Sequence, residues 1–434
     1  MKPSRAVKLA LKTYEGLWRT LTPVLSRNHR LRDGLAQRLG QPFPGGPFDI
    51  WIQAASAGEA YLAGLILEAF GVNTPYRILV TTNTRQGKDI IDTGLKQLRA
   101  LSRHNCWASA FFPFDRPSLM QKAVTTIQPR IMVLLETEIW PGLMCALKTR
   151  GIPIIIVNGR MQAKSLRHYQ VWPHFWQALR PDSILAVSLE DADRYARLYG
   201  RERVSVMPNM KFDRVNPVQG GDKPNPVGAL IPPGKPFAVL GSVRQEEEEA
   251  IIPLLRHLLD REPGIIIGLF PRHMHRIPAW QSRLQNAGIA YGLRSQAKLA
   301  GDPARVILWD VFGELASAYA VATSAFVGGS LAPLGGQNFL EPLACGIIPT
   351  IGPSWKTFEW VGQDIFDQGL VRVAPDWQKV ADSLLETMAT PPPPENVIAK
   401  LQRYVAERQG GTAIATRAIE RLLGSSASAS CVGG

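Results

Sequence analysis

The chain has 434 residues, 45% hydrophobic and 20% charged, with a formal net charge of +13. This length corresponds to two or three globular domains, and no apolar run approaches the ~20 residues that would span a bilayer. The four cysteines have neither the spacing of a zinc site nor that of a disulfide framework. We therefore expect a cytoplasmic protein without a secretory signal, a bound metal or another cofactor.

The N-terminal segment 1–40 is basic and amphipathic. It contains nine Lys or Arg residues against two acidic ones, which is more than half of the net charge. Within residues 7–25, apolar side chains recur at helical spacing and basic side chains form a separate stripe. Such a helix suits the headgroup region of an anionic membrane, although it could equally be an ordinary helix packed on its own domain. No nucleic-acid-binding module is recognisable, so we expect a membrane surface as partner and not nucleic acid.

From residue 48 onward, short β-rich runs alternate with segments of helical periodicity, which predicts βαβ units and parallel sheets. The predicted strands are Phe48–Gln53, Arg77–Thr82, Trp107–Phe112, Arg130–Leu135, Pro153–Val157, Ser183–Val187, Phe237–Gly241, Gly264–Phe270, Arg305–Trp309, Ser324–Val327, Ile348–Ile351 and Leu370–Val373.

The alternation stops at residues 214–236, where ten of 23 residues are Pro or Gly, as in an interdomain linker. We predict an α/β fold with two doubly wound Rossmann-like domains, 41–213 and 237–424, followed by a disordered tail, 425–434. Ligands of such sheets bind beyond the carboxyl ends of the strands, so the site is expected in a cleft between the two domains.

Acidic and basic residues follow several predicted strands of the first domain. Glu59, in the AASAGE turn after the first strand, could act as a general base or simply favour the helix N-terminus. Glu136 and Glu138, in ETEIWP, could hold a sugar hydroxyl, support Glu59 or cap the next helix. Lys211, in PNMKFD, could meet an anionic ligand at the interdomain hinge, although a solvated lysine is the commoner case.

The second domain has several features that suit an anionic ligand. Ser242 follows its first strand in a small-residue turn before the acidic run Glu246–Glu249, which we expect on the solvent side. Arg272 and His273 follow the next strand; guanidinium groups suit phosphate, whereas the histidine could be structural. The glycine-rich run 327–342 (VGGSLAPLGGQNFLEP) would expose backbone N–H groups and a helix start to phosphate, with Glu341 placed for ribose hydroxyls.

Taken in chain order, these motifs resemble those of the 3-deoxy-D-manno-octulosonic acid (Kdo) transferases. The matching blocks are SAGE, ETEIWP, NGRM, PNMKFD, GS followed by EE, PRH, GEL and GGS…GG.N.LEP. Their order and spacing match from about residue 48 to residue 360, and ETEIWP and PNMKFD are the most distinctive. Gln53 and Gln337 depart from the pattern, because the family usually has His at both positions.

The resemblance implies a GT-B fold and an inverting, metal-independent transferase of lipopolysaccharide core synthesis. Its donor would be CMP-Kdo, its acceptor a tetraacylated lipid A precursor, and its base Glu59. The resemblance further implies an enzyme resting on the cytoplasmic face of the inner membrane. We assign acceptor binding to Ser56, Gly58, Glu136 and Glu138, and donor binding to Lys211, Ser242, Arg272, His273, Gly329, Ser330, Gly336, Asn338 and Glu341. The alternatives are a GT-B enzyme that uses a UDP-sugar and a catalytically inactive, membrane-associated binding protein.

Overall fold

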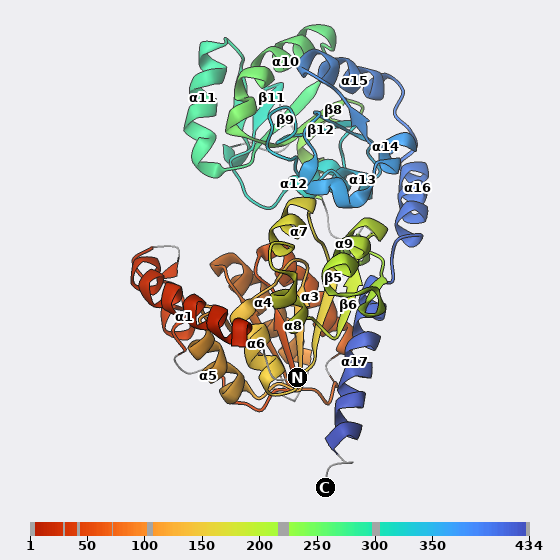
Figure 1. Cartoon of the computed structure of the whole chain (residues 1–434). Coiled ribbons are helices and arrows are strands. Elements are labelled where there is room, and N and C mark those ends of the chain that lie inside the picture. The colour runs from red at the N-terminus through yellow and green to blue at the C-terminus, as the bar shows by residue number, and fades with distance from the viewer. Residues whose placement is uncertain are drawn as a thin grey trace. The chain divides into compact units, whose positions relative to one another are not determined.

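The computed structural model describes residues 5–28, 31–40, 44–71, 73–101, 107–215, 225–296 and 304–430. The chain divides into two compact units, one formed by residues 1–214 and 408–434 and the other by residues 215–407 (Figure 1). Each unit contains one seven-stranded sheet in which all neighbouring strands pair in parallel. The predicted α/β class is confirmed.

The sheet of the first unit has the order β3-β2-β1-β4-β5-β6-β7. Its strands are β1 (Ile50–Gln53), β2 (Ile78–Thr82), β3 (Trp107–Phe111), β4 (Ile131–Leu135), β5 (Ile154–Gly159), β6 (Ser183–Ala186) and β7 (Val204–Val206). Its helices are α1 (Arg5–Leu25), α2 (Leu35–Arg38), α3 (Ala57–Phe70), α4 (Arg85–Leu101), α5 (Pro117–Ile127), α6 (Pro141–Thr149), α7 (Ala163–Tyr169), α8 (Pro173–Ala178), α9 (Leu189–Tyr199) and α17 (Gly411–Ser430), with short 3-10 turns η2 (Arg201–Arg203) and η3 (Met210–Arg214).

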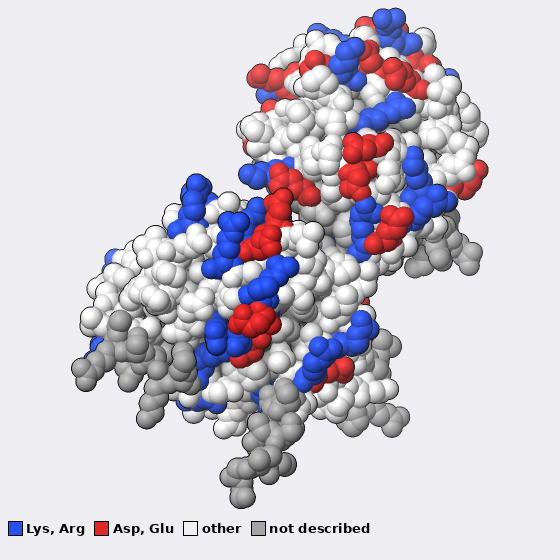
Figure 2. All heavy atoms as spheres, turned by 45° about the vertical axis from the view of Figure 1, so that its right-hand side comes forward, with Lys and Arg blue, Asp and Glu red and all other residues white. Residues whose placement is uncertain are grey.

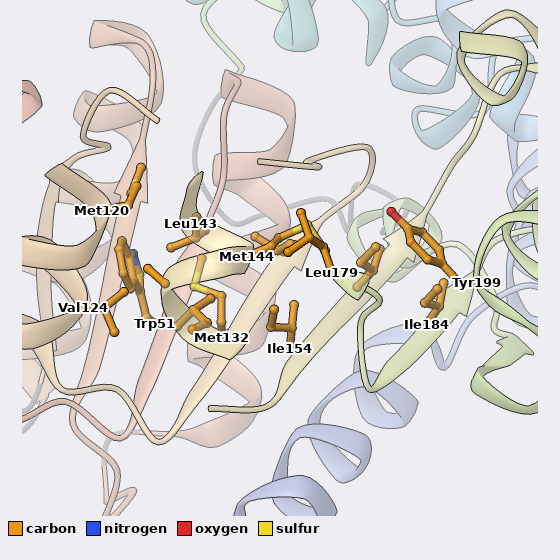
Figure 3. Close-up of a cluster of buried hydrophobic side chains, with 14 of the residues drawn as sticks. Trp51, Met120, Val124, Met132, Leu143, Met144, Ile154, Leu179, Ile184 and Tyr199 are labelled. Carbon is orange, nitrogen blue, oxygen red and sulfur yellow. The ribbon is translucent and has the colours of Figure 1, made fainter. Parts of the chain in front are cut away.

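Both faces of this sheet are buried, because successive strand residues point to opposite faces and both sets are apolar. Trp51, Met132 and Ile154 point into one core, which α1, α5, α6, α8 and α9 cover (Figure 3). Ile50 and Ile52 point into the other core, which α3, α4 and α17 cover. The carboxyl ends of the central strands are thereby held rigidly for the loops that follow them.

The C-terminal helix α17 belongs to the first unit, which corrects the predicted domain boundary. Residues 237–424 were expected to form the second domain, and the tail was expected to begin at residue 425. Instead, Ala415, Ile419 and Leu423 lie on one face of α17 and are buried in the core of the first sheet. Their spacing of four residues is that of an amphipathic helix, which explains why the chain returns to this unit. The helix continues to Ser430, and residues 431–434 lie outside the described part of the chain.

The N-terminal helix α1 packs on the first unit and is not a separate segment. Val7 and Leu11 are buried in its core, and Trp18 stacks on Phe114 with ring centroids 5.5 Å apart. Other apolar residues of the helix remain exposed, among them Leu17. The predicted apolar face is therefore divided between protein and solvent. None of the described helices is long and apolar enough to cross a membrane.

The sheet of the second unit has the order β10-β11-β9-β8-β12-β13-β14. Its strands are β8 (Phe237–Val243), β9 (Ile266–Pro271), β10 (Tyr291–Leu293), β11 (Val306–Leu308), β12 (Ser324–Val327), β13 (Pro349–Ile351) and β14 (Arg372–Val373). Its helices are α10 (Glu248–Arg261), α11 (Ile277–Asn286), α12 (Leu315–Tyr319), α13 (Leu340–Ala344), α14 (Asp364–Asp367), α15 (Trp377–Ala389) and α16 (Pro394–Ala406), with 3-10 turns η4 (Gly228–Leu230), η5 (Gln245–Glu247), η6 (Met274–Arg276), η7 (Arg294–Gln296) and η8 (Lys356–Val361). Helices α10, α11 and α15 cover one face of the sheet around a core that includes Leu254, Trp280 and Leu384.

The twelve predicted strands all occur, with ends that differ by at most two residues. The two strands that were not predicted, β7 and β10, are short and only partly buried, so they lack the apolar run that marks a buried strand. The predicted linker is partly structured: Val227 and Leu230 are buried in the second unit, whereas residues 216–224 lie outside the described chain. On the face drawn in Figure 2, basic and acidic residues intermingle over both units, and the described residues there form no broad cationic surface.

Candidate active site

In each sheet the strand order reverses at one point, between β1 and β4 in the first unit and between β8 and β12 in the second. Loops leaving two adjacent strands in opposite directions at such a point leave room for a ligand beyond their carboxyl ends. The residues predicted to form the site lie at the ends of these four strands or of their neighbours, except Lys211, which follows the edge strand β7. We describe the two units in turn.

Glu59 stands in the first turn of α3, directly after the turn that leaves β1. Ser56 caps the helix, because its hydroxyl accepts a hydrogen bond from the Glu59 N–H at 3.3 Å. The carboxylate of Glu59 turns back and accepts hydrogen bonds from the Ala55 N–H at 2.8 Å and from the Ser56 hydroxyl at 2.9 Å. Glu59 therefore has the helix-capping role that the sequence left open, and each carboxylate oxygen keeps a lone pair for a further proton or ligand. Gly58 lies beside it, where an added Cβ would meet nothing nearer than the Ser56 hydroxyl at 3.8 Å.

The two acids that follow β4 have different partners. Glu136 adopts a φ of 54° and pairs with the Lys211 ammonium, with 2.7 Å between Nζ and Oε1. Glu138 accepts a hydrogen bond from the indole N–H of Trp140. A positive φ is costly for a residue with a side chain, and such strain is concentrated at functional sites.

Burial and like charge raise the pKa of Glu59 to about 7. Burial is the largest cause, because only 6% of the residue is exposed, and the neighbouring Glu138 adds to it. The hydrogen bonds from Ala55 and Ser56 stabilise the carboxylate and partly oppose the rise. A carboxyl group with a pKa near neutrality can take a proton from a hydroxyl during a reaction and release it again afterwards.

Gln53, the last residue of β1, fixes the position of Glu138. Its side-chain oxygen accepts a hydrogen bond from the Thr81 hydroxyl at 2.6 Å, so its amide N–H groups point the other way. They donate to the Asn83 side-chain oxygen at 3.2 Å and to the Glu138 carboxylate. Burial raises the pKa of Glu138, and the hydrogen bond from Gln53 partly opposes this rise. The glutamine is fully buried and supplies a hydrogen bond without a charge, which is what a neutral histidine at this position would provide.

Lys211 lies in η3 of the first unit, where the PNMKFD turn holds it against Glu136. The turn is anchored by Asn158, which also has a positive φ, of 56°. The Asn158 side chain accepts a hydrogen bond from the Met210 N–H at 2.9 Å and donates to Glu136 at 3.4 Å. The structure thus joins Lys211 to the cluster of Glu59, Glu136 and Glu138 through its pair with Glu136, and its assignment to donor binding stays a prediction.

In the second unit, a buried carboxylate holds the glycine-rich loop. Glu247 is 1% exposed and accepts hydrogen bonds from the N–H groups of Gly329 at 2.6 Å, and of Ser330 and Leu331 at 2.8 Å. It also accepts one from the Arg244 N–H at 3.0 Å. This corrects two expectations: the acidic run does not lie entirely on the solvent side, and the N–H groups of Gly329 and Ser330 donate to protein.

Ser330 is therefore a structural residue. Its buried hydroxyl donates to the Val327 carbonyl at 2.6 Å and accepts from the Gly352 N–H at 2.8 Å, which joins the ends of β12 and β13. Gly336 has a φ of 81° and donates to the Gly329 carbonyl at 2.7 Å, so it closes the loop on itself. These contacts give the loop a fixed shape before any ligand binds.

Arg272 and His273 are exposed after β9, on a turn that buried charge holds in place. The Arg272 side chain donates to the Gln337 oxygen at 3.2 Å. Glu248, fully buried, accepts two hydrogen bonds from Arg276, at 2.9 and 2.6 Å, and pairs with Arg283 at 2.9 Å. A bidentate pair of this kind fixes the η6 turn and hence the backbone that carries Arg272.

The remaining predicted residues lie around the same sheet edge. Asn338 donates to Glu341 at 2.9 Å and accepts from the Leu340 N–H at 3.2 Å, and the short helix α13 begins two residues later, at Leu340, close to where a helix start was expected. Glu341 is close enough to Arg272 for the guanidinium to oppose the rise in pKa that desolvation causes. Ser242 adopts a φ of 56° where the pairing of β8 with β9 is irregular.

One buried acid of the first unit, Asp115, was not singled out in the sequence. Asp115 accepts hydrogen bonds from the Gly142 and Leu143 N–H groups, at 2.8 and 2.7 Å, and from the Tyr14 hydroxyl at 3.1 Å. Burial raises its pKa to about 7. Asp115 thereby holds the first turn of α6 and connects α1 to it. The only sequence feature that could have pointed to this residue is the Phe-Pro-Phe-Asp run after a strand.

In the described ranges, no group of three or more His, Cys, Asp or Glu side chains could hold a metal ion.

Known proteins share both the sequence and the fold. Residues 30–214 match the family model described as 3-Deoxy-D-manno-octulosonic-acid transferase (kdotransferase). The 3-deoxy-D-manno-octulosonic acid transferase of Bordetella pertussis is 32% identical over 388 residues, which cover 86% of this chain and 87% of the relative. The chain belongs to the Kdo transferase family. It is therefore a glycosyltransferase, as the motifs predicted.

A second Kdo transferase, from Haemophilus influenzae, is 31% identical over 73% of this chain and 74% of its own length. Among solved structures, a glycosyltransferase from Rickettsia africae matches 87% of this chain and 99% of its own with a TM-score of 0.57 at 9% identity. That likeness concerns the fold alone and agrees with the GT-B architecture predicted for a Kdo transferase.

Proposed function

We propose that this Kdo transferase moves Kdo from CMP-Kdo to a hydroxyl of a tetraacylated lipid A precursor, with inversion at the anomeric carbon and Glu59 as general base. The observation that carries the proposal is the state of Glu59: a buried carboxyl at the end of β1 with a pKa raised to about 7. The acceptor oxygen would form the new bond to the anomeric carbon while the bond to the CMP phosphate breaks and its electron pair leaves with CMP. Glu59 would take the hydroxyl proton.

The other carboxylates of the first unit support this role. Glu138 raises the pKa of Glu59, and Gln53 and Trp140 fix the Glu138 carboxylate by hydrogen bonds. The Lys211 ammonium pairs with Glu136, whereas the Glu59 carboxylate has only neutral partners in the described part of the chain and is the one that we assign to accept the acceptor's proton. Ser56, Glu136 and Glu138 lie where acceptor hydroxyls could bind.

For the donor, the exposed side chains at the edge of the second sheet are the best candidates. Arg272 has the donor geometry that suits phosphate or carboxylate, and Asn338 and Glu341 offer polar groups beside it. His273 is exposed on the same turn. Gly329 and Ser330 would contribute through the shape of the loop that Glu247 fixes, not through their N–H groups.

We propose that the enzyme rests on the cytoplasmic face of the inner membrane through α1. The helix docks on its own unit with one face and exposes apolar residues on another. The net charge of residues 1–40, with nine basic residues against two acidic ones, would add attraction to anionic lipid headgroups.

The test is a transfer assay with CMP-Kdo and the tetraacylated precursor, read by mass spectrometry. We expect added Kdo with the wild type and a loss of ~100-fold or more with Glu59→Gln, within the range attributed to general bases. Glu68→Gln is the matched control, because Glu68 is an exposed acid on the same helix. Transfer from a UDP-sugar, or no transfer by a folded wild type, would overturn the proposal in favour of the two alternatives.

A further inference from the structure

A groove of about 480 Å³ lies on the surface of the first unit, beside α1. Leu9, Thr13 and Leu17 of α1 form one side, and Pro141 of α6 with Trp172 and Phe175 at α8 form the other. Its volume is within the range of sites for small molecules or single chains. None of the contacts described above for Glu59 or for the second unit involves these side chains.

The lining side chains offer a ligand few hydrogen bonds, and the indole N–H of Trp172 is their main donor. The Thr13 hydroxyl donates to the Leu9 carbonyl of its own helix at 3.2 Å, and the Tyr14 hydroxyl, also in the lining, donates to Asp115 at 3.1 Å. The other lining side chains are apolar or aromatic. An extended peptide would leave backbone groups without partners there, at a cost in free energy, whereas a hydrocarbon chain has no such groups.

The groove continues into an exposed apolar stripe. Leu17, Leu21 and Val24 are 55%, 51% and 64% exposed, and at 100° per residue they lie on the same side of α1 as Leu9 and Thr13. Trp172, at the opposite wall, is 43% exposed. Contiguous exposed apolar side chains of this kind are characteristic of interaction sites. Lys12 and Arg19, exposed on α1, lie along one side of the stripe, which suits an amphiphile with an anionic head.

The wall of the groove is adjacent along the chain to the carboxylate site. Pro141 directly follows Trp140, whose indole N–H donates to Glu138, the acid that raises the pKa of Glu59. A lipid whose sugar reaches Glu59 thus has an apolar surface for its tail within the same unit.

We propose that this groove binds one acyl chain of the lipid acceptor and so helps to select acylated over unacylated acceptors. The inference rests on the proposed function, which supplies the acceptor, but it assigns a separate binding surface with its own residues. The chain would extend from the groove along the apolar stripe of α1 towards the bilayer.

Two tryptophan substitutions on α1 separate the groove from the rest of the helix. Thr13→Trp places an indole in the groove. Thr20→Trp is its matched control, because Thr20 is also exposed, also donates to a carbonyl of its own helix, and lies on the same side of α1 without lining the groove. Both variants add the same apolar side chain to the membrane-facing stripe.

With the tetraacylated acceptor, Thr13→Trp should raise KM about tenfold or more, since burial of two methylenes already corresponds to that factor. Thr20→Trp should leave KM within twofold of the wild type. With a fully deacylated acceptor, both variants should match the wild type, and both should bind anionic vesicles at least as well. An unchanged KM in Thr13→Trp, or an equal loss with the deacylated acceptor, would overturn the proposal.

A photoreactive acceptor carrying a diazirine on one acyl chain provides a readout that does not depend on turnover. We expect it to label peptides containing Leu9–Leu17 and Trp172–Phe175 in the wild type but not in Thr13→Trp, and unlabelled acceptor to compete. Equal competition by phosphatidylglycerol vesicles would show that the groove holds bilayer lipid instead and would overturn the assignment to the acceptor. If the wild type transfers no sugar even to the deacylated acceptor, the proposed function fails while the labelling still reports on the groove.

Discussion

Glu59→Gln should change the pH dependence of stability in a way that isolates this one carboxyl group. The pKa of Glu59 is raised from its ordinary value of 4.5 to about 7 in the folded state, mainly by burial. At ~1.4 kcal/mol per pKa unit, this rise corresponds to about 3 kcal/mol. Between these two pH values the folded protein binds the proton that the unfolded chain has released, so the free energy of unfolding of the wild type falls as the pH rises.

Glutamine does not titrate, so the variant should lack this fall. We expect the difference in unfolding free energy between Glu59→Gln and wild type to move by about 3 kcal/mol in favour of the variant between pH 4.5 and pH 8. The variant also loses a hydrogen bond from Ala55 or Ser56, at a cost of ~1 kcal/mol; because these bonds favour the carboxylate, their effect on the pH dependence is already contained in the pKa of about 7.

Urea unfolding at several pH values, followed by intrinsic fluorescence, would measure this difference. Asp115 has a pKa raised in the same direction, but it is present in both proteins and cancels. Glu68→Gln should show no such trend. A difference between Glu59→Gln and wild type that stays flat from pH 4.5 to pH 8 would refute the argument that burial keeps Glu59 protonated near neutrality.

Three further outcomes follow from the same contacts. Glu138→Gln removes the neighbouring charge, so the pKa of Glu59 should fall and the acid limb of the pH profile of kcat/KM should move to lower pH; an unmoved limb would contradict the coupling. Gln53→Leu removes a hydrogen bond that stabilises the Glu138 carboxylate, so the pKa of Glu138 should rise; a less ionised Glu138 raises the pKa of Glu59 less, so the acid limb should move to lower pH, and Gln53→His should restore it. Glu247→Ala leaves three loop N–H groups and the N–H of Arg244 without an acceptor. The free energy of unfolding measured in urea should therefore fall by ~3 kcal/mol or more, and the KM for the donor should rise. Glu246→Ala, at an exposed neighbouring residue, serves as the control.

The sequence predicts the architecture well where the physical signal is local. Apolar runs such as Ile131–Leu135 are long enough to require burial on both sides, and the helices between them fix a parallel sheet. The position of Glu59 near the helix N-terminus also follows from short-range spacing, because Ser56, which caps α3, stands three residues before it. Edge strands and domain boundaries lack such signals, which is why β7, β10 and the place of α17 did not follow from the pattern.

In the site, too, features set by nearby residues could be predicted from the sequence, whereas contacts between distant segments could not. The sequence identifies Glu59, Glu136, Glu138 and Lys211 as charged residues near strand ends, but the pairing of Lys211 with Glu136 depends on the register of distant segments. The glycine-rich loop correctly suggests anion binding, yet the anion it holds is the carboxylate of Glu247, from a motif 82 residues earlier in the chain. Backbone N–H groups that attract phosphate attract a buried glutamate for the same reason, and no sequence pattern separates the two.

Because α17 completes the core of the first unit, that unit is discontinuous along the chain, and this has a consequence for its synthesis. One face of the first sheet stays uncovered where Ala415, Ile419 and Leu423 pack until those residues have been made. The ribosome must first make the whole of residues 215–407, so at about 5–20 residues per second the nascent first unit waits roughly 10–40 s with apolar strand residues exposed. During that interval the incomplete face exposes apolar side chains that a chaperone could bind, and the first unit reaches its final stability only once α17 has been made.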